Sequence, residues 1–377
     1  MVETGAWLRT QYYPRPGETD WLDTVSREVR TVRSAVGVCD VSTLGRIDVQ
    51  GSDAGVFLDR VYTNAFSTLP VGKARYGLML REDGFVMDDG TTSRLATDHY
   101  FMTTTTANAA KVMQHLEFCH QVLWPDLDVQ MVSVSEQWAQ YSIAGPRSRD
   151  TLRSLVDAQH SLANEAFPHL AAQTVTIMGG LNALLFRLSF SGELAYELAV
   201  PARYGDAVIR AVMAAGEAFG IAPYGTEALG VMRIEKGHVS TNEINGQTTA
   251  HDLGAARMLS SRKDFVGRVM AERAALQSLD RPTFVGFKPA DRSQRLRAGA
   301  HFLPLGARPV ADNDQGYMTS VAFSPTVDHW VGLGLLEHGP QRFGERVRAY
   351  DPVRGGDIEV EVCDPIFVDP QRVRLHG

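Results

Sequence analysis

The segment from Lys73 to Leu95 contains two runs of alternating apolar and polar residues, separated by the turn sequence Glu82-Asp83-Gly84. This pattern predicts a β-hairpin, which can only belong to an antiparallel part of a sheet. Successive side chains of a strand point to opposite faces, so the second run would place Asp89 on the face of Met87 and Asp88 on the other. Only one of the two aspartates is therefore expected to face an apolar interior.

Asp89 is the aspartate that the alternation assigns to the apolar face. Burying a carboxylate is unfavourable unless something binds it, and desolvation raises its pKa toward the range useful in proton transfer. Asp89 is therefore a candidate catalytic residue. The alternative interpretation is that Asp88-Asp89-Gly90 forms a turn with solvated side chains.

Composition indicates an ordinary globular protein that acts on a small molecule. A chain of 377 residues is long enough for two or three domains with full cores. Its content of 44% apolar and 21% charged residues is typical of globular proteins. A net charge of -7 without a long basic run argues against nucleic acid or an anionic membrane as a partner. The start of the chain lacks the pattern of a signal peptide and no apolar run is long enough to span a membrane, so we expect a cytoplasmic protein.

Strands and helices alternate without the rhythm of a parallel sheet, and this favours the α+β class. Helical spacing predicts helices over 19–35, 107–122 and 225–236, the last ended by Gly237. Alternation predicts one strand over 38–51. From Arg281 onward, short strands broken by Gly and Pro predict a small all-β C-terminal domain.

Motifs of several common chemistries are missing from the sequence. It contains no dinucleotide-binding glycine pattern after a strand, no phosphate-binding loop and no serine-hydrolase elbow. His115 and Cys119 lie one helical turn apart, a spacing that suits two metal ligands. Cys119 also continues an apolar stripe and no third ligand is in view, so we interpret it as a core residue and expect no metal site.

Glu197 is the second candidate, in the segment Arg187 to Val200. Alternation places it on one face with Glu193 and Ala195, in a strand that ends in apolar residues. Such a glutamate is either paired or binds a ligand, and one carboxylate can accept two parallel N–H bonds from a flat 2-amino heterocycle. The alternative is an exposed or salt-bridged strand glutamate.

Many short motifs, in order, resemble those of the tetrahydrofolate-dependent aminomethyltransferases, the T-protein of the glycine cleavage system and its relatives. These motifs are Asp40-Val-Ser-Thr-Leu-Gly-Arg-Ile-Asp-Val-Gln-Gly, Tyr62-Thr-Asn, Gly72-Lys-Ala-Arg-Tyr-Gly-Leu-Met, Asp88-Asp89-Gly, Thr103-Thr-Thr-Thr, Ser191-Gly-Glu-Leu-Ala-Tyr-Glu, Arg233-Ile-Glu-Lys-Gly, Asp264-Phe-Val-Gly-Arg and Ser324-Pro-Thr. More closely, three further segments resemble the C-terminal, folate-binding half of the alpha subunit of heterotetrameric sarcosine oxidase: Tyr12-Tyr-Pro-Arg-Pro-Gly-Glu, Trp124-Pro-Asp-Leu and Asp364-Pro-Ile-Phe-Val-Asp-Pro.

The resemblance implies a three-domain cloverleaf around a central hole that holds folate, with a small β-barrel at the C-terminus. On this basis we expect a discontinuous α+β domain from residues 1–50 and 134–270. Residues 51–133 would form an α+β meander domain that carries Asp89, and residues 281–377 the barrel domain.

The resemblance also assigns roles to residues of this sequence. It implies that Asp89 lies beside the reacting nitrogens of tetrahydrofolate, that Glu197 grips the pterin, and that Tyr76 and Leu44 line the pocket. The implied reaction transfers a one-carbon group from an N-methyl amine or its imine, gives 5,10-methylene-tetrahydrofolate and releases an amine. A flavin-dependent oxidase subunit is an expected partner, because it could deliver the imine.

Departures from the T-protein pattern argue against the glycine cleavage reaction itself. Leu229 stands where the T-protein has an arginine, Phe190 where it has a tyrosine, and the segment from Val239 to Gln247 replaces a Gly-Gln-Asp segment. Two other functions remain open. One is a tetrahydrofolate-dependent S- or O-demethylase that gives 5-methyl-tetrahydrofolate, and the other is a non-catalytic folate-binding module.

Overall fold

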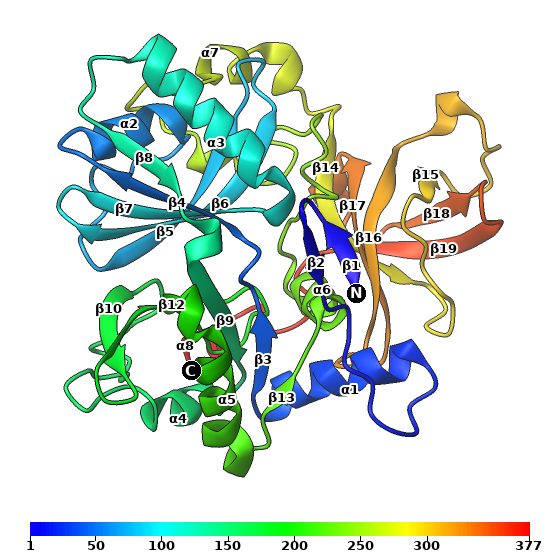
Figure 1. Cartoon of the computed structure of the whole chain (residues 1–377). Helices are drawn as coiled ribbons and strands as arrows, with labels where there is room; N and C mark the ends of the chain where they lie inside the picture. The colour runs from blue at the N-terminus through cyan, green and yellow to red at the C-terminus, as the bar shows by residue number, and fades with distance from the viewer.

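Three separate β-sheets organise the chain in the computed structural model, which describes all 377 residues (Figure 1). They are a six-stranded sheet, a five-stranded sheet and a closed six-stranded barrel, and a small hairpin of β1 (Val2–Thr4) and β2 (Trp7–Arg9) precedes them. Helices lie between and upon the sheets, so the predicted α+β class is confirmed. No helix combines the length and the apolarity that a membrane crossing requires.

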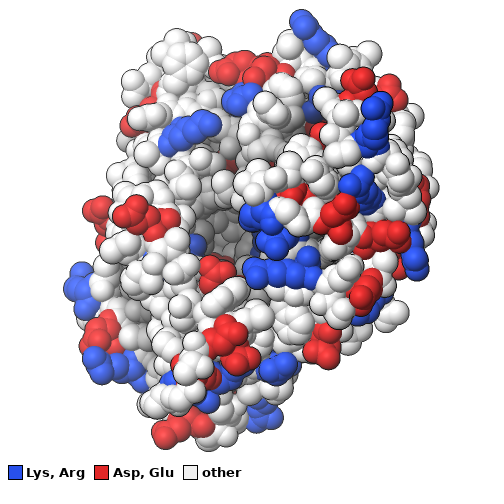
Figure 2. All heavy atoms as spheres, turned by 90° about the vertical axis from the view of Figure 1, so that its right-hand side faces the viewer, with Lys and Arg blue, Asp and Glu red and all other residues white.

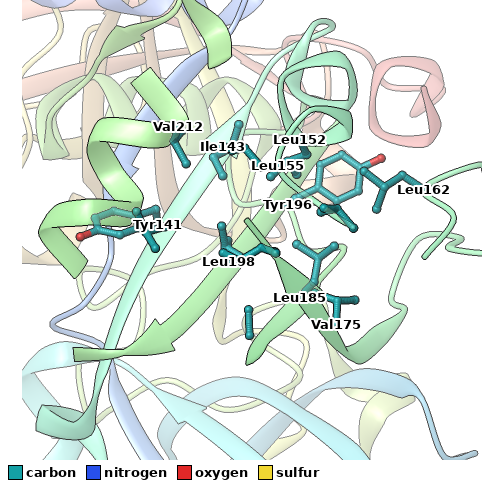
Figure 3. Close-up of a cluster of buried hydrophobic side chains, with 14 of the residues drawn as sticks. Tyr141, Ile143, Leu152, Leu155, Leu162, Val175, Leu185, Tyr196, Leu198 and Val212 are labelled. Carbon is teal, nitrogen blue, oxygen red and sulfur yellow. The ribbon is translucent and has the colours of Figure 1, made fainter. Parts of the chain in front are cut away.

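The six-stranded sheet is antiparallel except for the short last strand, which runs parallel to its neighbour. In sheet order its strands are β10 (Ala172–Ile177), β11 (Leu181–Phe186), β12 (Ala195–Pro201), β9 (Trp138–Ala144), β3 (Gly37–Asp40) and β13 (Ala222–Pro223). One face packs against α4 (Ser148–Arg153) and α5 (Gly205–Gly216). Figure 3 shows this core, in which Tyr196 and Leu198 of β12 point toward side chains of the helices and neighbouring strands. The alternate residues of β12, including Glu197, therefore face the rest of the molecule.

The five-stranded sheet is fully antiparallel and consists of a three-stranded meander with two further strands beside it. In sheet order its strands are β5 (Lys73–Leu80), β6 (Val86–Ala96), β7 (His99–Thr104), β4 (Gly45–Gln50) and β8 (Gln130–Ser133). Helices α2 (Ala54–Val61) and α3 (Ala109–Phe118) cover one face. Side chains between Ile244 and Ala271, which include the short α7 (Arg268–Ala271), cover the other face at β5 and β6.

The C-terminal barrel is confirmed as predicted. Its strands close in the order β14 (Pro282–Pro289), β17 (His329–Glu337), β16 (Gly316–Ser324), β15 (His301–Leu303), β18 (Arg346–Asp351) and β19 (Gly356–Cys363). Helices α1 (Trp21–Ser34) and α6 (Thr226–Lys236) share one hydrophobic cluster with strands of the barrel and the six-stranded sheet. Gly237 ends α6 in the left-handed conformation, as predicted. The chain then returns from the barrel to α8 (Val373–His376), which packs near the six-stranded sheet (Figure 1).

Three sequence expectations differ from the structure at element boundaries. The single strand predicted over 38–51 is two strands, because the chain turns at 41–44 and β3 and β4 then join different sheets. The first two predicted domains were divided after residue 50, whereas β4 pairs with β7 and β8 of the five-stranded sheet. The helix predicted over 107–122 ends as an α-helix at Phe118 and continues as a π-helical turn, Cys119–Leu123.

Candidate functional site

The hairpin that carries the two aspartates contains a β-bulge. Asp88 pairs with Met79, whereas Leu80 pairs with Val86, so Met87 is an extra residue without a partner. Because of this extra residue, the side chains after Met87 point to the faces opposite to those that simple alternation predicts. The prediction that Asp89 shares a face with Met87 is therefore wrong, because Met87 packs in the core beneath α2 and α3.

Asp88 and Asp89 point to opposite faces of the meander, and Asp88 is buried whereas Asp89 is half-buried. Asp88 is only 1% exposed and accepts hydrogen bonds from Thr105 Oγ1 at 2.7 Å and Asn108 Nδ2 at 2.9 Å. Burial raises the pKa of Asp88, and these donors oppose the rise. Asp88 is thus an anchor between the hairpin and the start of α3, and Asp88, rather than the predicted Asp89, is the aspartate that faces the buried interior.

Asp89 forms a pair with Tyr76 of the neighbouring strand. Tyr76 Oη donates to Asp89 Oδ2 at 2.7 Å. Burial, reinforced by the charge of Asp88 and partly offset by Tyr76, raises the pKa of Asp89 to about 7. Burial also raises the pKa of Tyr76, but Tyr76 remains 36% exposed, so solvent reaches the pair. A carboxyl group in this state can exchange protons near neutral pH.

Glu197 lies on β12 opposite Ser142 of β9, on the face turned away from α4 and α5. Gln140 Nε2 donates to its Oε2, while its Oε1 has no partner within the chain. Burial raises the pKa of Glu197, and the charge of Arg46 and the bond from Gln140 oppose the rise. Glu197 is therefore half-buried and forms no salt bridge, and its accessible Oε1 is free for a ligand.

Glu193 does not share the strand face with Glu197. It precedes the first residue of β12 and is 2% exposed. Ion pairs hold it to Arg33 at 2.7 Å and to Arg374 at 3.0 Å. Glu193 therefore ties α1 to the C-terminal segment and is not part of the candidate site.

A short loop connects the surroundings of Glu197 with those of Asp88. Leu44 lies partly buried in this loop, 41–44, between β3 and β4. The Oγ1 atoms of Thr43 and Thr106 lie 3.3 Å apart, and Thr106 follows the residue that donates to Asp88. The predicted site residues Asp89, Tyr76, Glu197 and Leu44 thus lie on elements joined by direct contacts.

The segment that departs from the T-protein pattern, 239–247, is pinned to the barrel. Glu243 in this segment is fully buried and accepts from Arg233 Nη1 at 2.9 Å, and from Thr319 Oγ1 and Ser320 Oγ at 2.6 Å each. Its charge contributes to the raised pKa of Asp89. The segment therefore forms a fixed wall beside Asp89, which sequence patterns alone did not indicate.

Two other polar clusters carry no comparable chemistry. His115 Nε2 lies 3.6 Å from Cys119 Sγ, and Cys119 is fully buried in the core of the meander, in agreement with its interpretation as a core residue. No group of three metal-ligating side chains occurs in the structure. A cavity of about 560 Å³ beside α4 and α8 contains four arginines, of which Arg33, Arg153 and Arg374 are paired with carboxylates.

Comparison with known proteins places this arrangement in a family. The family described as GCVT N-terminal domain matches residues 1–263, and the glycine cleavage T-protein C-terminal barrel domain matches residues 283–369. An aminomethyltransferase of Corynebacterium aurimucosum is 30% identical over 84% of this chain and 82% of its own length. The chain belongs to the glycine cleavage T-protein family.

Within this family, the chain is similar over its full length to sarcosine oxidase subunit alpha of Rhizobium meliloti, with 54% identity. It spans only 38% of the length of that subunit. The aminomethyltransferase T of the glycine cleavage system from Bartonella henselae has the same fold, with a TM-score of 0.82, 22% identity and coverage of 97% of this chain and 93% of that one. The predicted resemblance and fold are thereby confirmed.

Proposed function

We propose that this chain is a tetrahydrofolate-dependent one-carbon transferase. It would accept a methylene group from an N-methyl amine or its imine, and give 5,10-methylene-tetrahydrofolate and an amine. One observation carries the proposal: two carboxylates with different properties occur on connected elements. Asp89 has a pKa of about 7, which suits proton transfer, and Glu197 has an oxygen that is free for a ligand. Membership of the T-protein family supports the choice of folate.

The residues fit a reduced folate. Glu197 can accept two parallel N–H bonds from the 2-amino edge of a pterin, because Oε1 is free and Oε2 retains a lone pair beside its bond from Gln140. Tyr76 and Leu44 would contribute apolar surface to the ring and its linker. Figure 2 shows a hollow in the barrel-side face with basic side chains on one edge, which suits an acidic ligand. When bound, the folate supplies the two nitrogens that take up the carbon.

Asp89 would act at the reacting nitrogens in two ways. Its ionised carboxylate would stabilise the positive charge that develops on the transferred carbon. It would also accept one of the two N–H protons that the nitrogens lose and pass it to the departing amine, which receives both protons as it leaves the imine carbon. Tyr76 would orient this carboxylate through its 2.7 Å hydrogen bond.

The source of the imine is also part of the proposal. An N-methyl amine reaches the imine level only after it loses two electrons, so we propose a flavin-dependent oxidase partner. Similarity to the alpha subunits of sarcosine oxidase supports this assignment.

Product analysis tests the proposed function. The chain is incubated anaerobically with tetrahydrofolate, a ¹³C-methyl amine and a stoichiometric amount of a separate flavin oxidase in its oxidised form, whose flavin takes up the two electrons as the imine forms. We expect labelled 5,10-methylene-tetrahydrofolate to form faster than without the chain, and Asp89→Asn to remove this acceleration. Labelled 5-methyl-tetrahydrofolate, formed when a ¹³C-methyl thioether or ether replaces the amine, would instead indicate the demethylase. Folate binding without any acceleration would indicate the non-catalytic module.

A further inference from the structure

Arg46 of β4 is a fully buried cation with no carboxylate in direct contact. Its side chain leaves the five-stranded sheet and reaches the six-stranded sheet. In the loop 41–44 between the two sheets, Nη2 donates to the carbonyl of Val41 at 2.9 Å and Nη1 to that of Ser42 at 2.8 Å, with a longer contact to Leu44 at 3.3 Å. Desolvation of such a charge is unfavourable unless a nearby anion balances it.

The link from Arg46 to an anion passes through one side chain, Gln140. Arg46 Nε donates to Gln140 Oε1 at 2.8 Å, and Gln140 Nε2 donates to Glu197 Oε2. Because the amide oxygen is taken up by Arg46, the amide N–H₂ must face Glu197. Gln140 is itself fully buried, so this orientation has no competing solvent contact.

We propose that Arg46 and Gln140 are positioning residues that fix the orientation and the charge of Glu197 for binding of a pterin edge. The same guanidinium holds the loop that carries Leu44, so one buried cation organises two walls of the candidate pocket. This inference rests on the proposed function, because it assigns the pterin to Glu197. Neither Arg46 nor Gln140 need contact the ligand.

Asp89, with a pKa of about 7, titrates within the candidate site, but Gln140 does not contribute to that pKa. The titratable groups closer to Glu197 keep one charge state between pH 5 and 9. Burial raises the pKa of Cys39 to about 12 and also raises that of Tyr224, so both stay neutral in this range. Arg46, whose pKa burial lowers to about 10, stays charged. If a substitution of Gln140 changes the pH dependence of pterin binding in this range, the change therefore reports on the protonation of Glu197.

The deciding variant is Gln140→Glu. It keeps the size of the side chain and an acceptor for Arg46, but replaces the N–H donor that faces Glu197 with an oxygen. Removal of this donor raises the pKa of Glu197, so binding should require a higher pH. We expect the dissociation constant for tetrahydrofolate to increase at least about tenfold at pH 6 and to recover substantially at pH 9, because one charge-assisted hydrogen bond has this order of effect.

Calorimetric titration of the full chain under anaerobic conditions, at several pH values, measures this effect. Gln137→Glu is the matched control, because Gln137 is exposed three residues earlier and makes no side-chain hydrogen bond. A second variant, Gln140→Met, removes the donor without adding a charge and should shift the profile in the same direction by a smaller amount.

The outcomes separate the inference from the proposed function. If the wild-type chain does not bind tetrahydrofolate, the proposed function fails. If the wild type binds and both Gln140 variants bind with the same affinity and the same pH profile, the positioning role is wrong. A loss of affinity that is equal at all pH values, with a lowered melting temperature, would also overturn it, since that result indicates a structural role alone.

Discussion

The Asp89→Asn variant tests whether the chain maintains a strained carboxylate at the candidate site. Asparagine has nearly the same size and can still accept the hydrogen bond that Tyr76 donates at 2.7 Å. The substitution therefore removes the charge with little change in packing. Because burial and Asp88 make that charge unfavourable, the variant should be more stable than the wild type whenever Asp89 is ionised.

The magnitude follows from the pKa of Asp89. A pKa of about 7 in the folded state lies roughly 3 units above the ordinary value for Asp, and at about 1.36 kcal/mol per unit this sets an upper limit of about 4 kcal/mol. Since solvent reaches the pair of Asp89 and Tyr76, we discount this to about 1–2 kcal/mol.

The sign of the effect depends on pH. The folded state binds the proton of Asp89 more tightly than the unfolded state does. The stability that this proton contributes is present below the ordinary pKa of Asp and is lost as pH rises through the folded value of about 7. The advantage of Asp89→Asn over the wild type should therefore be small at pH 5 and largest at pH 8.

Urea unfolding of both proteins at pH 5 and pH 8 measures this difference. Asp98→Asn is the control, because Asp98 is exposed and its carboxylate makes no hydrogen bond or ion pair. One-carbon transfer by Asp89→Asn should be lost while folate binding is retained. A stability difference between Asp89→Asn and the wild type that is identical at both pH values would refute the reasoning.

Three further substitutions have directions that the structure fixes. Tyr76→Phe removes the hydrogen bond that lowers the pKa of Asp89, so the pH profile of transfer should move to higher pH, and an unchanged profile would contradict the assigned pair. Glu193→Gln breaks a buried ion pair with Arg33 and should lower the free energy of unfolding by about 3 kcal/mol without changing folate affinity; equal melting temperatures would argue against it. Gly90→Ala would place a Cβ 1.9 Å from a carbonyl oxygen of β7, so it should destabilise the protein by at least about 2 kcal/mol in urea unfolding and weaken folate binding.

The hairpin and the barrel could be predicted from the sequence because both depend on local patterns. Alternation around the Glu82-Asp83-Gly84 turn is enough to identify β5 and β6, and the Gly- and Pro-broken strands after residue 281 identify the barrel. The bulge at Met87 could not be predicted, since an extra residue in one strand shows only when the partner strand is placed beside it. The catalytic role of Asp89 therefore stays a prediction, whereas the face assigned to it was wrong.

The surroundings of Glu197 were missed for a different reason. Arg46 alternates with Ile47 and Val49 of β4, a pattern typical of a strand with one solvated face. In the structure this polar face meets another sheet, and Arg46 becomes fully buried against it. Contacts of this kind depend on how distant segments of the chain pack together. The sequence contained two signals of the contact between Arg46 and Gln140: the family motif that contains Arg46, and the position of the polar Gln140 within a mostly buried strand.

The central claim of this account is that Asp89 and Glu197 belong to one folate site. Anaerobic calorimetric titration of the chain with tetrahydrofolate, repeated with Glu197→Ala and Asp89→Asn, tests it most directly. The account predicts saturable binding at one site in the wild type, loss of binding in Glu197→Ala with the fold intact, and retained binding in Asp89→Asn. Absence of binding to the wild type, or an affinity that Glu197→Ala leaves unchanged, would contradict it.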